Sequence, residues 1–287
     1  LVSVHEYLAE YRGQPSDIRD APSLTTVASL GSRLPNVPLP LPHPYVYALA
    51  TGILYNATGG GHGPVYLLGE LSQRGWWHYF FVAFALKTPL ALFPLVVAAA
   101  ALSPRWFRKN ALDESALLVA TVVLFAFFSF ACTAQLGVRY LLPVLPFLFV
   151  AVGKAAAYTP RRHATAYRAT LAALVLWFAI SSLSFHPHYL SYFNELIGDR
   201  KNMYRYLADS NVDWAQSDEY LARYLAAPDR GPVAVNPEAP VTGRVVVNVN
   251  ALVGITAPRE KYAWLRDRFE PVDHVAYAWL VYEIPGR

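Results

Sequence analysis

Long apolar runs separated by short polar linkers dominate the middle of the chain. The runs are Phe80–Leu102, Ser115–Thr133, Tyr140–Tyr158 and Ala169–Phe185. The hydrocarbon core of a bilayer is about 30 Å thick and an α-helix rises about 1.5 Å per residue, so runs of this length cross it or nearly so. The pattern predicts an α-helical multi-spanning membrane protein with about four transmembrane helices in residues 80–185.

The hydropathy pattern changes after the fourth run. Arg244–Leu252 is rich in valine and alternates, which predicts a strand, and His274–Ile284 predicts a second strand. Arg259–Phe269 has the spacing of a helix, and Ser210–Asp213 matches a capping box that would open another. Residues 186–287 are therefore predicted to form a small α/β domain.

The region before the first run, residues 1–79, is mixed in polarity. Leu34–Pro44 is rich in proline and predicts an extended loop, whereas Tyr45–Ala57 is apolar but too short to span and predicts an interfacial or buried helix. Gly59–Pro64 lacks the Gly-Lys-Ser/Thr ending of a P-loop, which argues against nucleotide binding. Residues 1–79 are predicted to be a loop region outside the bundle.

The distribution of charge predicts an orientation. Positive charge gathers in the linker after the first run and around the end of the third, at Arg105, Arg108, Lys109, Lys154, Arg161, Arg162 and Arg168. The turn between the second and third runs holds only Arg139. The positive-inside rule places the two basic linkers in the cytoplasm, so residues 1–79 and 186–287 are expected outside.

Overall composition narrows the class of protein further. The chain is 55% hydrophobic and 14% aromatic, and its net charge is only +4. Its basic residues flank the apolar runs instead of forming a patch with stacking aromatics, so nucleic-acid binding is not predicted. Cys132 is the single cysteine, and cysteine usage therefore gives no information about the compartment.

Six short motifs carry a resemblance to a known family. They are Tyr66–Glu70, Gly75–Phe80, Leu86–Leu90, Arg139–Pro143, His186–Glu195 and Asp209–Gln216. In order and spacing they resemble the polyprenyl-phosphate-dependent glycosyltransferases of the GT-C superfamily. The closest group is the bacterial members of glycosyltransferase family 39, which are related to protein O-mannosyltransferases and aminoarabinose transferases. The chain departs from the usual pattern at Asp199, Ala215 and Ser217, where that group has Gly, Gly and an acid.

The resemblance implies an activity and a location. Such enzymes move a sugar, with inversion, from a polyprenyl-phosphate donor to an acceptor at the outer face of the membrane, without a cofactor. The expected partners are the lipid-linked donor and membrane lipids, and the expected location is a bacterial inner membrane with the C-terminus outside. In this family the catalytic acid follows the first transmembrane helix, so it would lie upstream of Leu1, and the chain would be the C-terminal part of the enzyme.

Glycosyl transfer from a lipid phosphate requires two kinds of group. A carboxylate must take the proton of the acceptor, and cations or other donors must stabilise the charge on the departing phosphate. Lys87 lies seven residues into the first run, about 10 Å deep by helix rise, and is predicted either to contact phosphate or to snorkel to the interface. Arg139 matches phosphate oxygens, and its alternative role is to anchor to lipid headgroups.

Aromatic and polar residues near the same membrane surface complete the candidate list. Trp77 and His78 could stack on a sugar or donate to a phosphate, and Tyr140 could line the same mouth, although all three also suit an aromatic belt. His62 and Glu70 are polar groups on the predicted outer side, and Glu70 could act as a base or form a salt bridge.

The motif Asp209–Gln216 adds further candidates. Asp209 and Asp213 are four residues apart, so on a helix they would share a face and could bind a cation or the acceptor, or Asp213 could serve the cap. Trp214 could contact a glycan or belong to the core. The spacing of His186 and His188 does not suit two ligands on one helix face, and no metal site is predicted.

Two other functions remain open from the sequence. A non-enzymatic membrane module could use the outer domain to hold a glycan or a partner protein, and the missing catalytic loop favours this for the chain taken alone. A transporter would show inverted repeats and more polar residues at mid-membrane, and neither feature is present in the sequence.

Overall fold

The computed structural model describes Tyr45 and residues 63–108, 110–158, 160, 162–228 and 231–286. The predicted proline-rich loop, the predicted short helix except for Tyr45, and the glycine-rich turn up to His62 lie outside the described residues. The first described segment is a hairpin of β1 (Val65–Leu67) and β2 (Glu70–Ser72), in which Leu67 pairs with Glu70. Leu68 and Gly69 both have positive φ, at 49° and 91°, which is the conformation of a two-residue hairpin turn.

The first apolar run is not one straight span. It forms α5 (Tyr79–Lys87) and α6 (Leu92–Phe107), whose axes differ by 108°. Thr88 is extended, with φ −108° and ψ 133°, because a residue that precedes proline disfavours the helical region. Pro89 also cannot donate a backbone hydrogen bond, so α5 ends before it. The prediction of a single span over Phe80–Leu102 is therefore corrected to a broken pair.

The next three apolar stretches are continuous. α7 (Ala111–Ala126) ends in a π-helical turn, η1 (Phe127–Ala131), and a 3₁₀ segment, η2 (Val138–Val144), leads into α8 (Leu145–Ala157). α9 (Ala164–Leu183) completes the bundle. These three stretches are long and apolar enough to cross a membrane, and the count rises to four if the bent pair is one span. The membrane-protein class predicted from the sequence is confirmed to this extent.

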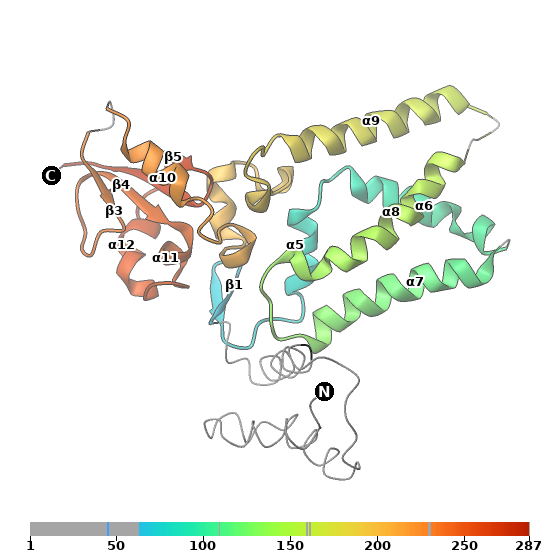
Figure 1. Ribbon diagram of the computed structural model, residues 1–287, viewed down its shortest axis with the longest axis horizontal. Helices are drawn as coiled ribbons and strands as arrows, with labels where there is room; N and C mark the ends of the chain where they lie inside the picture. The colour runs from blue at the N-terminus through green and yellow to red at the C-terminus, as the bar shows by residue number, and fades with distance from the viewer. Residues whose placement is uncertain are drawn as a thin grey trace, which may run out of the picture.

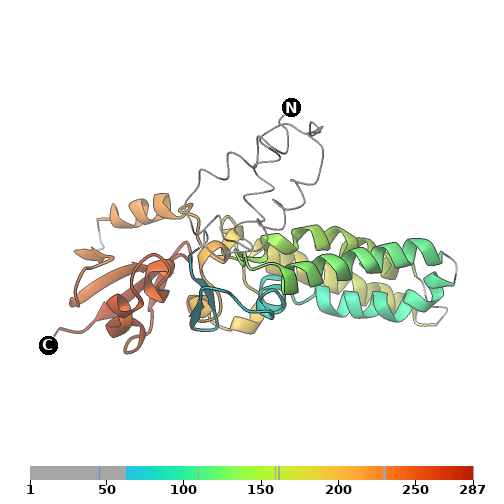
Figure 2. The same cartoon turned by 90° about the horizontal axis from the view of Figure 1, so that it is seen from below.

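The bundle has two distinct ends. α6 ends and α7 begins at the end where α8 ends and α9 begins, far from the C-terminal region (Figure 2). α5, η2 and the last turn of α9 lie at the opposite end, beside the segments that follow residue 188 (Figure 1). Arg105 and Lys154 are therefore at the end remote from the C-terminal unit, as the grouping of basic linkers predicted.

The C-terminal unit begins with a chain of 3₁₀ segments. These are η3 (Tyr189–Ser191), η4 (Glu195–Ile197), η5 (Arg200–Arg205) and η6 (Asp209–Asn211). They connect α9 to the sheet, and the next helix, α10 (Asp218–Leu225), starts only at Asp218. The helix predicted after the capping box is present as α10 but starts later than predicted, because residues 209–211 form a 3₁₀ turn and Ala215 has a left-handed φ of 64°.

A four-stranded sheet closes the unit in the order β3-β4-β6-β5. Its strands are β3 (Val233–Val235), β4 (Gly243–Asn248), β5 (Asp273–Val275) and β6 (Trp279–Ile284), and only β3 and β4 are parallel. Its helical elements are α11 (Val249–Val253), η7 (Arg259–Tyr262) and α12 (Ala263–Arg266).

The predicted strands are present but shorter than expected. The first ends at Asn248, whose side-chain oxygen accepts from the amide of Asn250 and caps α11. The second is divided into β5 and β6, because Ala276 and Tyr277 take left-handed conformations with φ of 50° and 63°. The helix predicted over 259–269 is present as η7 and α12.

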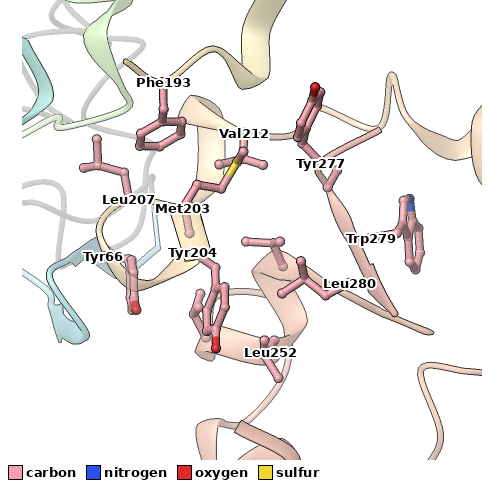
Figure 3. Packing of buried hydrophobic residues seen from close by; sticks show 14 of the residues in the cluster. Tyr66, Phe193, Met203, Tyr204, Leu207, Val212, Leu252, Tyr277, Trp279 and Leu280 are labelled. Atoms are coloured by element: carbon pink, nitrogen blue, oxygen red, sulfur yellow. The ribbon is translucent and has the colours of Figure 1, made fainter. Parts of the chain in front are cut away.

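One hydrophobic core connects the sheet to the bundle (Figure 3). Leu280 and Leu252 belong to the sheet and to α11, Met203 and Leu207 lie in and just after η5, and Phe193 reaches toward α5. All five side chains are at most 2% exposed. The C-terminal unit is therefore packed continuously onto the mouth of the bundle, and this packing fixes the position of the loops that form the site.

Candidate functional site

The broken end of α5 is held by a buried amide from a distant segment. The Asn194 side chain is 2% exposed and donates to the carbonyls of Ala85 and Thr88, at 2.5 and 2.8 Å. Its backbone N–H donates to the carbonyl of Leu86. The last carbonyls of a helix have no partner within it, so Asn194 supplies the donors that the break before Pro89 removes.

A second buried amide joins three elements at the same mouth. The Asn211 Oδ1 atom accepts from the backbone of Val138 in η2 at 3.1 Å, and its Nδ2 donates to the Tyr79 hydroxyl in α5 at 2.8 Å. The same hydroxyl accepts from the amide of Gly137 at 3.1 Å. A buried donor or acceptor that loses its hydrogen-bond partner costs about 1–3 kcal/mol. This network therefore fixes η6 against α5 and η2.

A cavity of about 640 Å³ opens between these anchored segments. Its walls come from α5, η2, the end of α9, and the loops between residues 189 and 216. Lys87 and Arg139 are the cations in its lining, and among the described residues that line it there is no Asp or Glu. The two leading candidates from the sequence, 52 positions apart in the chain (139 − 87), thus share one cavity.

Lys87 is the last residue of α5 and lies at the bend. Its ammonium donates to the carbonyls of Leu190 and Asn211, at 2.7 and 2.5 Å, and lies 4.4 Å from the centre of the Phe193 ring. An ammonium has three N–H donors, so one remains for a ligand. The bend places Lys87 in a cavity wall at the junction, which differs from the position inside a straight span assumed for it.

Arg139 is the second residue of η2 and lies over an indole ring. Its guanidinium carbon is 4.1 Å from the centre of the Trp214 ring and 5.5 Å from that of Tyr140. No carboxylate of the described residues lies within ion-pair distance of it. Arginine always carries its charge and offers five donors in a rigid fork, so this group is available to a bidentate anion.

A smaller, apolar space of about 100 Å³ adjoins the cavity. It shares Lys87, Pro89, Val138, Leu142 and Phe178 with the larger space. Its other walls are Thr88 and apolar side chains of the bundle, including Phe84, Leu92, Leu145 and Phe149. The combined space is cationic at the junction and apolar toward the helices.

The remaining predicted aromatic residues lie outside this cavity. Tyr140 packs against Phe80 and Phe128, with ring centres 6.2 and 5.6 Å away, so it supports η2 from behind. Trp77 is 63% exposed and stacks on Phe130 of η1. His78 contacts Trp77 edge-on and does not line the cavity.

The predicted acidic residues also lie behind or beyond the cavity wall. Glu70 is exposed on β2, and His62 is outside the described residues. Asp209 accepts from the hydroxyl of Ser210, a lining residue, at 3.0 Å. Asp213 is buried and accepts from Ser217 and Asn248, at 2.7 and 2.9 Å. The two aspartates do not share a helix face, and Asp213 ties its loop to the sheet.

Several lining residues were not candidates from the sequence. Ser182 comes from the last turn of α9, and Tyr189 and Leu190 come from η3. Their position depends on the packing of the C-terminal unit against the bundle, which no local pattern encodes. Trp214 lines the cavity and is 56% exposed, which excludes the core role considered for it.

A histidine cluster lies at the outer border of the junction. The His186 ring nitrogen Nδ1 and the Tyr189 hydroxyl are 3.0 Å apart, and His188 contacts the Tyr220 and Tyr277 rings at 4.5 and 5.7 Å. Desolvation, and then the nearby charge of His186, lowers the pKa of His188. Within the described part of the chain, no group of three or more His, Cys, Asp or Glu gathers as a metal ion would need.

Comparison of the chain with models of protein families, with curated proteins and with solved structures finds no match. The resemblance to the GT-C glycosyltransferases therefore remains an expectation based on sequence motifs.

Proposed function

We propose that the cavity binds a lipid phosphate and that the chain is the donor-binding part of a membrane glycosyltransferase. The donor would be a sugar linked to a polyprenyl phosphate. The observation that carries this proposal is that Lys87 and Arg139 line one cavity that has no acidic residue among its described lining and adjoins an apolar space. Two cations without an acid favour an anion, and the adjoining apolar space favours a hydrocarbon tail on it.

The charges of the site support the proposal in more detail. A bidentate guanidinium and one free ammonium donor match the oxygens of a phosphate diester. When the bond between the sugar and the phosphate oxygen breaks, negative charge grows on the phosphate, and cations already in place stabilise it. Lys87 and Arg139 would therefore serve both the binding of the donor and the departure of the phosphate.

The acceptor must lose a proton to a base, and the described cavity lining supplies no carboxylate. The family resemblance assigns that step to an acid on a loop that follows the first transmembrane helix. We accordingly assign donor binding to this chain and the complete transfer to the whole protein. The grouping of basic linkers at the far end of the bundle favours a cavity at the outer surface of a bacterial inner membrane, with the C-terminus outside.

Binding can be tested in lipid nanodiscs with decaprenyl phosphate and with decaprenol, the same lipid without the phosphate. We expect saturable binding of the phosphate and at least about tenfold weaker binding of the alcohol, because two charge-assisted interactions are lost. Arg205→Gln serves as a control, since Arg205 pairs with Glu270 at the surface. Equal binding of the two lipids would contradict the proposal.

The transfer reaction needs a second assay on the full-length protein. Radiolabelled sugar on decaprenyl phosphate is followed into any acceptor present in the native membrane. We expect Lys87→Met and Arg139→Gln to abolish transfer at limiting donor, and Arg139→Gln should leave the amount of folded protein unchanged. Phosphate-dependent binding by a full-length protein that transfers no sugar would support the alternative of a non-catalytic module.

A further inference from the structure

We propose that Trp214 forms the sugar subsite of the donor, in the larger cavity and outside the adjoining apolar space. The inference rests on the proposed binding of a lipid phosphate. It gives Trp214 a role in positioning the sugar. This role is separate from the binding of the phosphate by the two cations and of the tail by the apolar space.

The indole of Trp214 is exposed, yet its backbone is firmly held. The side chain of Gln216 accepts from the backbone N–H of Trp214 at 2.5 Å and donates to the carbonyl of Val212 at 3.1 Å. Ala215, between them, has a φ of 64°. A large aromatic side chain that stays 56% exposed on a fixed turn is presented to something outside the fold.

The position of Trp214 relative to Arg139 indicates what that ligand is. The indole centre is 4.1 Å from the guanidinium carbon of Arg139. A sugar on a phosphate diester is joined to phosphorus through a single oxygen, so its ring must lie next to the phosphate. A phosphate bound by Arg139 would therefore bring the sugar within reach of Trp214.

Because the apolar space adjoins only one part of the cavity, the donor is expected to bind in one orientation. Phe84 and Leu92 line that space, and Lys87 lies in both spaces, whereas Trp214 and Gln216 line only the larger one. In this orientation the tail lies between the helices, the phosphate at the two cations and the sugar on the indole. This is the order of the three groups in the donor.

The chemistry of a pyranose suits this end of the cavity. Its C–H face packs on an aromatic ring, and its hydroxyl groups need amide and hydroxyl partners. The amide nitrogen of Gln216 has a second N–H beyond its bond to Val212, and the hydroxyl of Ser210 can still accept after donating to Asp209. Both residues line the cavity.

The test compares decaprenyl phosphate with decaprenyl phosphate mannose, glucose and aminoarabinose on the wild-type protein and on Trp214→Leu. At least one sugar-linked lipid should bind the wild type more tightly than the bare phosphate. Trp214→Leu should lower the affinity for that lipid about tenfold more than the affinity for the bare phosphate. Trp214→Phe should retain most of the sugar-dependent gain, because it keeps an aromatic face.

Trp264→Phe is the matched control, since Trp264 lies in the C-terminal unit beside Phe269 and does not line the cavity. An equal loss for both lipids in Trp214→Leu would overturn the inference, because it would show that Trp214 only holds Arg139 or anchors the protein in the headgroups. An unchanged affinity for the sugar-linked lipid would also overturn it. If the wild type binds neither lipid, the proposed function itself fails, which is a distinguishable result.

Discussion

Two lysines in the described part of the bundle each line a cavity, and their surroundings differ. At the mouth, Lys87 shares its cavity with Arg139 and with no described acid. At the far end, a cavity of about 260 Å³ between α6, α7 and α8 holds Lys154, which forms an ion pair with Glu114. The side chains of that pair are only 17% and 9% exposed.

The difference separates a structural cation from one that is available to a ligand. An ionised side chain in a low-dielectric place needs a partner, and Glu114 satisfies Lys154 within the fold. The mouth cavity instead has two cations in its lining and no described acid, so nothing in that lining neutralises them. The backbone carbonyls that hold Lys87 position its ammonium without neutralising it.

The largest effect is expected from breaking the far pair. Lys154→Met leaves the Glu114 carboxylate buried without its cation, and the loss of a partner in such a pair costs about 3–5 kcal/mol. The free energy of unfolding in mixed micelles measures this loss. The double variant Lys154→Met with Glu114→Gln should recover most of the stability, and both variants should bind decaprenyl phosphate like the wild type once folded.

The complementary change at the mouth is Arg139→Gln. We expect the affinity for decaprenyl phosphate to fall about 30- to 100-fold, since a charge-assisted bidentate interaction is removed. The unfolding free energy should change by less than about 1 kcal/mol, because Arg139 has no ion-pair partner to strand. Lys154→Gln is the control for binding. Equal loss of binding in both variants would remove the distinction between the two cavities.

A third prediction concerns the scaffold of the mouth. Asn194→Ala leaves the carbonyls of Ala85 and Thr88 without donors and should lower the unfolding free energy by about 2–3 kcal/mol. Hydrogen exchange should increase at the end of α5 and leave α7 unaffected. Asn202→Ala is the matched control, because Asn202 is a half-buried asparagine in η5. Equal effects of the two substitutions would show that Asn194 is not a specific clamp.

Acid should weaken the outer border of the mouth more than the bundle. Desolvation lowers the pKa of both His188 and His274 below the ordinary 6.5, so the folded state favours the neutral rings. Near and below pH 6.5 the unfolded chain binds more protons than the folded chain, so stability is level above about pH 7 and falls as the pH drops from there to 5.5. His274→Gln should flatten this slope, and an unchanged slope would contradict the assignment.

The smallest effect is expected at the surface of α10. Glu219 and Arg223 form an exposed pair one helical turn apart, with side chains 72% and 69% exposed. Such pairs contribute about 0.3–0.5 kcal/mol, so Arg223→Ala should shift the unfolding free energy by no more than that. A loss above 1 kcal/mol would mean that α10 makes contacts beyond this surface pair.

The sequence predicted the secondary structure well where a single hydrophobic pattern extends over many residues. The three continuous helices could be predicted because apolar side chains persist through them without a break. The first run misled in part, since it was expected to form one span and instead forms two helices whose axes differ by 108°. Pro89 ends α5, and Asn194 donates to carbonyls at the break.

The candidate site was predictable only at its cations. Lys87 and Arg139 are rare charges beside apolar runs, and that contrast singled them out. Tyr189 and Ser182 carry no such signal, because serine and tyrosine are ordinary at the ends of membrane helices. Asp213 was misplaced because the capping-box pattern suggested a helix where the chain forms a 3₁₀ turn and a left-handed residue.

The most direct test is a cryo-electron microscopy map of the protein in nanodiscs saturated with decaprenyl phosphate. The account predicts phosphate density within hydrogen-bond distance of the Arg139 guanidinium and the Lys87 ammonium, with the tail running past Phe84 and Leu92 into the apolar space. Phosphate density beside Lys154 instead, or an empty mouth cavity at saturating lipid, would contradict the claim that the unneutralised cations are the binding site.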